Sequence, residues 1–327
     1  MSIKVGINGM GRIGRMVVRS IIESKNKNIK IKHINNRSNS EISRDLIKND
    51  SIHGRFDADL NFDENHLIIN KNKITFSQES KIENIDWKKY DVDYVFECTG
   101  KFNSREQLLP HLENGVKKVI VSAPCKMADK TIVFGVNHKR INKNDKIISA
   151  ASCTTNCLAP VADVLNSNFV ILNGFMTTIH AFTSDQRILD NSHKDPRRAR
   201  SASQSIVPTS TGASKAIGEI IPSLRDKLQG VAMRVPIANV SLVEFIFNVK
   251  KRISINKIND ALLKASKRYP KNILIVSKEK LVSILGDEVV EEFPWKNKMK
   301  PSTDNNVEGV LRRTWKPALS IVGSDGL

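Results

Sequence analysis

One cysteine in this chain lies where a thiol can become a nucleophile. Residues 149–160 read Ser-Ala-Ala-Ser-Cys-Thr-Thr-Asn-Cys-Leu-Ala-Pro, which predicts a strand end, a tight polar turn and a helix beginning near Cys153. The free N–H groups and positive dipole end of a helix N-terminus favour an anion, and the thiolate is the reactive form of cysteine. Small neighbours such as Ala151 and Ser152 leave room for a substrate. We therefore predict a nucleophilic Cys153; the plainer alternative is a cysteine buried at a helix start.

A glycine-rich turn near the N-terminus predicts a dinucleotide site. A short apolar strand over 3–8 is followed by Gly-Met-Gly-Arg-Ile-Gly at 9–14, an apolar-periodic helix and a second strand over 29–35. This is the context that a Gly-x-Gly-x-x-Gly match requires, because the turn admits a pyrophosphate and the helix N-terminus holds its charge. The cofactor-binding candidates in this turn are Gly9, Gly11, Arg12, Ile13 and Gly14.

The end of the second strand bears on the choice between NAD and NADP. An acidic residue normally binds the adenine ribose 2′-hydroxyl at this point, but the chain has Asn35-Asn36-Arg37-Ser38. No carboxylate is present to repel a 2′-phosphate, and the arginine and serine could bind one. The stretch is therefore consistent with NADP binding, and equally with a solvated polar turn.

The order of elements predicts an α/β chain of two domains. Strands and helices alternate up to about Ser152, which is typical of a Rossmann-type doubly wound parallel sheet. Strands over 92–98 and 119–122 end where such a sheet places its ligand crevice, which adds Thr99, Gly100 and Ser122 to the cofactor candidates. Strands then predominate over 174–180, 231–235 and 241–250, which indicates an α+β domain with a largely antiparallel sheet.

Composition limits the possible classes of protein. The chain has 327 residues, 40% of them hydrophobic, which suggests two globular domains. No apolar run approaches the roughly 20 residues that span a bilayer, and the first residues enter a strand without a signal peptide. Four cysteines do not form a disulfide framework, so we expect a reducing cytoplasm. Cys153 and Cys157 have helical spacing, but no His or Cys cluster completes a metal site.

The net charge of +18 raises the possibility of nucleic-acid binding. The lysines are scattered, however, without a dense run and without interleaved aromatic residues. We therefore favour a solvated basic surface that attracts anionic small molecules, with no specific nucleic-acid partner and no membrane.

Taken together, the motifs resemble phosphorylating glyceraldehyde-3-phosphate dehydrogenase of the bacterial type. The resemblance extends over residues 1 to about 283. The matching stretches are 8–15, 149–160, 176–181 (MTTIHA), 208–215 (PTSTGASK) and 234–236 (RVP).

The resemblance implies a Cys–His pair. His180 lies 27 residues after Cys153, the spacing that the family uses; taken alone, it could be a core histidine after an apolar strand. In the implied reaction the thiolate attacks an aldehyde to give a thiohemiacetal, hydride passes to NAD or NADP, and phosphate releases the resulting thioester as an acyl phosphate. His180 would lower the pKa of the thiol and then act as general base. The expected function is oxidation of D-glyceraldehyde 3-phosphate to 1,3-bisphosphoglycerate, in glycolysis and gluconeogenesis.

The resemblance also implies two anion sites. Thr183 and Arg234 match the family's ligands for the substrate phosphate, and Arg198 matches an arginine shared with the second site. The residues that match its ligands for inorganic phosphate are Ser152, Thr154, Thr211 and Gly212. Arginine suits the bidentate geometry of phosphate. For Arg197 and Arg200 a solvated or subunit-facing loop is the better interpretation.

Residues 182–203 correspond to a family loop that packs between subunits, so we expect a homotetramer. Asn191-Ser192 stands where many NAD-specific members have a Leu-Pro pair, and a serine there resembles NADP-using members. Two alternatives remain open: erythrose-4-phosphate dehydrogenase, which Thr211 and Gly212 argue against, and an inactive NAD(P)-binding relative.

The inactive alternative arises from residues 284–327, which depart from the family and contain three prolines. A frameshift or a natural replacement would each explain the departure, and we expect this tail to be poorly ordered. The predicted domains are an NAD(P)-binding domain over 1–152 and a catalytic domain over 153–283, followed by the tail.

Overall fold

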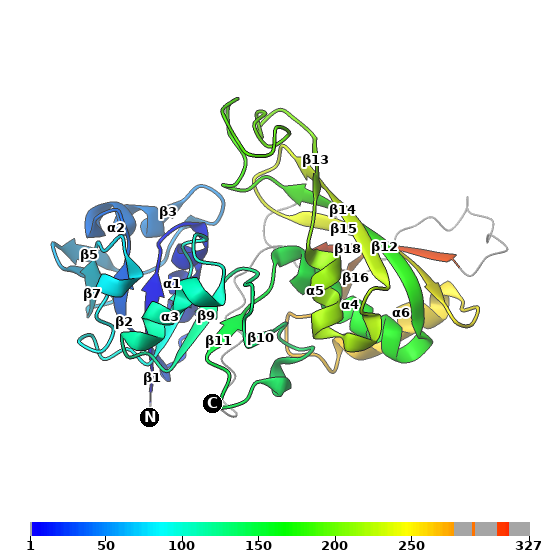
Figure 1. Cartoon of the computed structure of the whole chain (residues 1–327), viewed down its shortest axis with the longest axis horizontal. Coiled ribbons are helices and arrows are strands. Elements are labelled where there is room, and N and C mark those ends of the chain that lie inside the picture. Colours follow the sequence, from blue (N-terminus) through cyan, green and yellow to red (C-terminus); the bar gives the residue numbers. More distant parts are fainter. Residues whose placement is uncertain (1, 278–289, 292–305, 314–327) are drawn as a thin grey trace. The chain divides into compact units, whose positions relative to one another are not determined.

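The computed structural model describes residues 2–277, 290–291 and 306–313, and it divides the chain into two compact units (Figure 1). Unit 1 comprises residues 2–132 and 138–152. Unit 2 comprises residues 133–137 and the described residues from 153 onward.

Unit 1 is built on a nine-stranded sheet that is parallel except at one edge. Its order is β10 (Lys130–Thr131), β11 (Ile147–Ser149), β9 (Lys118–Val121), β8 (Tyr94–Glu97), β1 (Ile3–Asn8), β2 (Ile29–Asn35), β7 (Asn72–Ser77), β6 (His66–Ile69) and β5 (Leu60–Asp63). All pairs from β10 to β7 are parallel, and β5 and β6 add an antiparallel hairpin. The prediction of a doubly wound parallel sheet is confirmed, with this hairpin as an addition.

Alternating side chains build one core on each face of this sheet. Phe96 and Ile120 join the cluster that contains α1 (Arg12–Glu23) and α2 (Ser40–Lys48). Their apolar neighbours in sequence, Val95, Val119 and Val121, join a second cluster with Leu108 of α3 (Arg105–Glu113). Because strand side chains alternate between faces, two-sided burial accounts for the nearly continuous apolar sequences of these strands. Unit 1 also contains β3 (Asn49–Asp50), β4 (Gly54–Arg55), η1 (Ile82–Asn84) and η2 (His138–Arg140).

Unit 2 has a five-stranded, largely antiparallel sheet, as predicted. Its order is β13 (Val207–Ser210), β14 (Leu228–Val235), β12 (Ile171–Ala181), β15 (Ser241–Val249) and β18 (Asn306–Arg313), and only β12 and β14 run parallel. Its helices are α4 (Cys153–Phe169), α5 (Ala213–Ile220), η3 (Pro222–Leu224) and α6 (Ile255–Ser266). Helix α4 packs against α5 and α6. In β12 the side chains of Met176, Thr178 and His180 form the buried row.

Two strands of the tail are described. β17 (Val290–Glu291) pairs with β16 (Val276–Ser277), and β18 pairs antiparallel with β15. The expectation of poor order for the rest of residues 284–327 lies outside the described residues.

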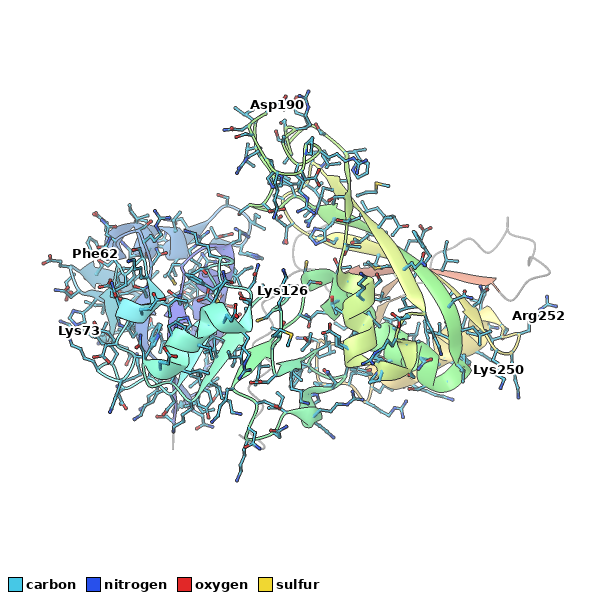
Figure 2. The ribbon with its side chains drawn as sticks, viewed as in Figure 1. Phe62, Lys73, Lys126, Asp190, Lys250 and Arg252 are labelled. Carbon is cyan, nitrogen blue, oxygen red and sulfur yellow. The ribbon has the colours of Figure 1, made fainter. Side chains whose placement is uncertain are left out.

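The positive charge is spread over many elements. Figure 2 labels Lys73 on β7, Lys126 after β9, and Lys250 and Arg252 after β15, and all four side chains are exposed.

Within the described part of the chain, no helix has the length and apolar character needed to cross a membrane.

Candidate functional site

The glycine-rich turn closes tightly onto two neighbouring segments of unit 1. Gly9 has φ +94°, and its N–H donates to Asn35 O at 2.8 Å. A Cβ on Gly9 would lie 2.8 Å from Thr99 atoms, and a Cβ on Gly14 would lie 1.9 Å from Gly9 O. Glycine at both positions therefore lets the turn pack against the end of β8 and lets α1 begin directly beside it.

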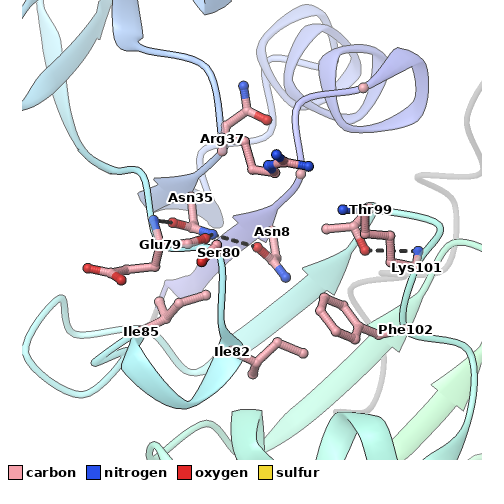
Figure 3. Close-up of a pocket in the computed structure, with 13 residues that line it drawn as sticks. Asn8, Asn35, Arg37, Glu79, Ser80, Ile82, Ile85, Thr99, Lys101 and Phe102 are labelled. Carbon is pink, nitrogen blue, oxygen red and sulfur yellow. Dashed lines mark hydrogen bonds between the residues drawn. The ribbon is translucent and has the colours of Figure 1, made fainter.

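A pocket of about 150 Å³ lies at the carboxyl ends of β1, β2 and β8 (Figure 3). Its lining includes six residues that the sequence predicted: Gly9, Gly11, Asn35, Asn36, Arg37 and Thr99. Seven others were missed: Asn8, Glu79, Ser80, Ile82, Ile85, Lys101 and Phe102. Asn8 ends β1 directly before the glycine turn, so its place in the sequence could have identified it as a pocket residue. Most of the others come from segments whose position only the tertiary fold determines.

Several predicted cofactor residues have other contacts or lie outside the pocket. The guanidinium of Arg12 forms an ion pair with Asp50 at 2.8 Å. Burial opposes ionisation of Asp50, but N–H groups of His53 and Ile52 and the bond from Arg12 outweigh it and lower its pKa to about 2. The Oγ of Ser122 donates to Glu97 O at 3.1 Å. Of the other candidates, Ile13, Gly14 and Gly100 do not line the pocket, and Ser192 belongs to unit 2.

Asn36, where a carboxylate would bind the ribose, is held by the protein itself. Its Oδ1 accepts from the N–H of Met10 at 3.2 Å, and its Nδ2 donates to Ser43 Oγ at 3.2 Å. The amide thus ties the glycine turn to α2. Arg37 is exposed and lines the pocket, which leaves a cation facing the cofactor space.

A buried hydrogen-bond network fixes the polar wall of the pocket. The Nδ2 of Asn35 donates to Asn8 Oδ1 at 2.9 Å and to Glu79 O at 3.0 Å, while its Oδ1 accepts from Glu79 N at 2.8 Å (Figure 3). Asn8 in turn donates to Glu97 Oε2 at 2.7 Å. That carboxylate also accepts from His111 and from the backbone and hydroxyl of Thr99. Because each of these buried polar groups has partners, the network makes the wall rigid.

His33 lies behind this wall and gives unit 1 a pH-dependent stability. It is fully buried, stacks on Tyr90 at 3.7 Å and contacts the hydroxyls of Thr75 and Ser77 at 2.8 Å. Burial lowers its pKa from 6.5 to about 3. Below pH 6.5 an unfolded chain therefore binds a proton that the folded chain does not, so stability is lost as the pH falls from 6.5 towards 3.

We expect the free energy of unfolding to fall by about 2–3 kcal/mol between pH 7 and pH 4.5 through His33 alone. Urea unfolding at both pH values would measure it. Carboxylates also titrate in this range, so the informative quantity is the difference from His33→Gln, which has no titrating ring. An identical pH dependence in the two proteins would contradict the assignment.

In unit 2, helix α4 begins at Cys153, as the sequence predicted. The Sγ atom of Cys153 lies 3.0 Å from Nε2 of His180. Burial alone would raise the pKa of the thiol. The bond to His180 and its charge, the charge of Arg234 and the N–H of Thr154 outweigh burial and lower the pKa to about 7. About half of the thiol is then ionised at neutral pH. At Cys98 the other causes do not outweigh burial, and the pKa of that thiol rises to about 12.

Strand register brings Arg234 to this pair. β12 and β14 are parallel and place His180 directly beside Arg234. Nη1 of Arg234 lies 2.7 Å from His180 Nδ1 and donates to Ala181 O at 3.0 Å. The sequence assigned both residues to the site but could not predict this contact, because it depends on the pairing of strands more than fifty residues apart.

The remaining anion-site candidates lie at helix starts and in the 182–206 segment of unit 2. Arg198 donates from Nε and Nη2 to Thr209 Oγ1, at 3.1 and 2.8 Å, and pairs with Asp185. Thr154 lies in the first turn of α4, directly after Ser152 and Cys153, and Thr211 and Gly212 directly precede α5. The carbonyl oxygen of Thr183 accepts a hydrogen bond from the N–H of Gln186 within the same turn. Helix N-termini of this kind favour anions.

No group of three or more His, Cys, Asp or Glu residues suited to a metal ion occurs among the described residues.

A doubly wound sheet with a glycine turn and pocket, together with a Cys–His pair in a second unit, is typical of dinucleotide-dependent dehydrogenases that work through a covalent cysteine intermediate. Two family models match the chain: "Glyceraldehyde 3-phosphate dehydrogenase, NAD binding domain" over residues 3–105 and "Glyceraldehyde 3-phosphate dehydrogenase, C-terminal domain" over residues 152–302. The second match extends past residue 283, where the motif resemblance ends.

Relatives of known name agree with these models. Glyceraldehyde-3-phosphate dehydrogenase of Geobacillus stearothermophilus is 48% identical over 284 residues, which is 86% of this chain and 84% of the relative. The protein of the same name from Priestia megaterium is 47% identical with the same coverage. Glyceraldehyde-3-phosphate dehydrogenase 2 of Bacillus subtilis is 46% identical over 284 residues, 86% of this chain and 83% of the relative. The chain belongs to the glyceraldehyde-3-phosphate dehydrogenase family.

Proposed function

We propose that the chain oxidises D-glyceraldehyde 3-phosphate to 1,3-bisphosphoglycerate with reduction of NAD or NADP, in glycolysis and gluconeogenesis. The observation that carries the proposal is the Cys153–His180 pair, with its 3.0 Å separation and a thiol pKa of about 7. Residues 1–152 form the NAD(P)-binding domain, and residues 153–283 form the catalytic domain.

The pair performs the chemistry in two stages. The Cys153 thiolate adds to the aldehyde carbon, and the backbone N–H of Cys153 and the His180 ring stabilise the oxyanion. The imidazolium of His180 gives its proton to this oxyanion to form the thiohemiacetal hydroxyl, and the neutral ring takes that proton back as hydride leaves carbon, which gives a thioester. The nicotinamide, when bound, accepts that hydride. A phosphate oxygen then attacks the thioester carbon, and Cys153 leaves as thiolate with release of the acyl phosphate.

Two groups of residues supply the anion sites. Arg234 and Thr183 bind the phosphate of the substrate. Ser152, Thr154, Thr211 and Gly212 bind inorganic phosphate, with Arg198 shared between the sites. The contact between Arg234 and His180 supports the assignment of Arg234 to the substrate-phosphate site. The position of Thr211 and Gly212 directly before α5 supports their assignment to the inorganic-phosphate site.

The proposal is tested by dinucleotide reduction with glyceraldehyde 3-phosphate, in the presence and absence of phosphate or arsenate. Turnover should require the anion. Thr211→Ala should raise the KM for phosphate by roughly tenfold, the scale of one hydrogen bond to an anion, and change the KM for the aldehyde much less. Phosphate-independent turnover would identify a thioester-hydrolysing enzyme of the erythrose-4-phosphate dehydrogenase kind. Absence of any turnover would favour the inactive relative.

For the cofactor we propose that NADP is accepted at least comparably to NAD. Arg37 is exposed on the pocket wall, and Asn36 carries no charge to repel a 2′-phosphate. Ser38 offers a further donor. Asn36→Asp should shift the ratio of kcat/KM values towards NAD by about 1–3 kcal/mol. Matched assays with both cofactors measure this, and a strict NAD preference of the unmodified chain would contradict it.

We propose a cytoplasmic homotetramer. The outer row of the unit 2 sheet exposes Phe175 and Val231, at 41% and 36%, and register places them with Ile246 on one face. The 182–203 segment exposes Ile188 and Leu189, at 56% and 72%. Apolar groups exposed in this way are typical of surfaces that bury themselves against another copy. Light scattering of the purified chain would measure the mass in solution, and a monomer at micromolar concentration would contradict the proposal.

A further inference from the structure

A buried carboxylate lies behind the polar wall of the dinucleotide pocket. Glu97 ends β8, is 1% exposed and does not itself line the pocket. Its two side-chain oxygens bond Asn8, Thr99 and His111. Of these partners, Asn8 and Thr99 do line the pocket. Glu97 is therefore connected to a ligand in the pocket through these two side chains.

The direction of the hydrogen bond from Asn8 is fixed by the backbone. Main-chain atoms of Glu79 set the orientation of the Asn35 amide, because the N–H donates to Oδ1 at 2.8 Å and the carbonyl oxygen accepts from Nδ2 at 3.0 Å. The Nδ2 of Asn35 also donates to Oδ1 of Asn8 at 2.9 Å. Asn8 must therefore present its own Nδ2 to Glu97, and it donates to Oε2 at 2.7 Å.

The direction of the bond from His111 is fixed in the same way. The indole N–H of Trp87 can only donate, and it donates to Nδ1 of His111 at 2.9 Å. The ring proton of His111 is then on Nε2, which lies 3.1 Å from Oε2 of Glu97. On the other side, the N–H of Thr99 donates to Oε1 at 2.8 Å. Both oxygens of Glu97 thus face groups that donate, so an amide in place of the carboxylate would set two donors against each other.

The same carboxylate determines what Thr99 can offer a ligand. The hydroxyl of Thr99 donates its single proton to Oε1 of Glu97 and accepts the N–H of Lys101 at 3.1 Å (Figure 3). One lone pair then remains on this oxygen, and no proton. A ligand group that binds the Thr99 hydroxyl must therefore be a donor, such as a hydroxyl or an amine. A phosphate oxygen, which only accepts, finds no partner in it.

We propose that Glu97 is a positioning residue for the dinucleotide: it fixes Asn8 and Thr99 in the pocket wall and makes the Thr99 hydroxyl an acceptor for a hydroxyl or amino group of the ligand. This rests on the proposed function, in which the chain uses NAD or NADP. Because the role depends on a side chain that only accepts hydrogen bonds, removing the charge without changing the volume of the side chain should weaken dinucleotide binding.

The test is the Kd for NADH, measured from the change in NADH fluorescence on binding to the full chain. Glu97→Gln keeps the side-chain volume but places an amide N–H against a donor, so the Kd should rise by about tenfold or more, the scale of one hydrogen bond to a charged group. Thr99→Val, which removes the hydroxyl, should raise the Kd by about fivefold or more. Thr99→Ser keeps the hydroxyl and should leave the Kd within about threefold.

A double variant separates positioning from a general loss of stability. Since Glu97 acts through Thr99, the Kd of Glu97→Gln combined with Thr99→Val should rise by less than the product of the two single effects. His111→Gln is the matched control, because His111 bonds the same carboxylate and does not line the pocket. It should lower the free energy of unfolding and leave the Kd within about twofold. Multiplicative single effects, or an equal rise of the Kd in His111→Gln, would overturn the proposal.

The Thr99 variants leave Glu97 in place, so they remain informative if Glu97→Gln does not fold. An unchanged Kd in Thr99→Val would then overturn the proposal. Binding of NADH requires no turnover. The expected changes in Kd without oxidation of glyceraldehyde 3-phosphate would therefore support this role of Glu97 and contradict the proposed function, whereas turnover with a Kd that none of these variants changes would do the reverse.

Discussion

Cys153→Ser is expected to lower kcat by at least about 10³-fold, because a serine hydroxyl is barely ionised near neutral pH and His180 alone cannot supply a thioester intermediate. The structure gives the physical reason: the thiol at the start of α4 has a pKa of about 7. The measurement is the rate of dinucleotide reduction with glyceraldehyde 3-phosphate at saturating phosphate. Affinity for the dinucleotide, whose pocket belongs to unit 1, should not change.

Cys157→Ser, one turn further along α4, is the control and should retain activity within about threefold, since Cys157 lacks the helix-start position. Iodoacetamide should label Cys153 far faster than Cys98 or Cys125, because burial raises the pKa of both of those thiols. Equal labelling of all cysteines, or an active serine variant, would remove Cys153 from its catalytic role.

Gly14→Ala is expected to destabilise unit 1 by about 3 kcal/mol or more, because the added Cβ would lie 1.9 Å from Gly9 O and the backbone would have to move. The same movement would displace the turn that lines the dinucleotide pocket, so the Kd for NAD(P) should rise by at least about tenfold. Urea unfolding measures the first effect, and titration of cofactor binding measures the second.

Gly11→Ala provides the matched control, because a Cβ at Gly11 meets no atom within 4 Å. Its free energy of unfolding should change by less than about 1 kcal/mol. Its Kd should nonetheless rise, since Gly11 lines the pocket and a methyl group there occupies cofactor space. A stable Gly14→Ala variant with normal cofactor affinity would show that this glycine is not required by the packing of the turn.

The local features of this protein could be predicted from sequence because they depend on neighbouring residues. The turn over 9–14, the helix start at Cys153 and the type of each sheet follow from apolar periodicity and from glycine and small polar residues at turns. The family spacing predicted that His180 pairs with Cys153, and Sγ of Cys153 does lie 3.0 Å from Nε2 of His180.

What only the tertiary structure decided are the contacts between segments distant in sequence. The register of β12 against β14 places Arg234 beside His180, a contact that no motif contains. The segment after β7 places Glu79 within hydrogen-bond distance of Asn35. The pairing of β2 with β7 places His33 of β2 against two hydroxyls of β7. A short motif cannot encode these contacts, because each one depends on strand pairing and burial, which the whole sheet fixes at once.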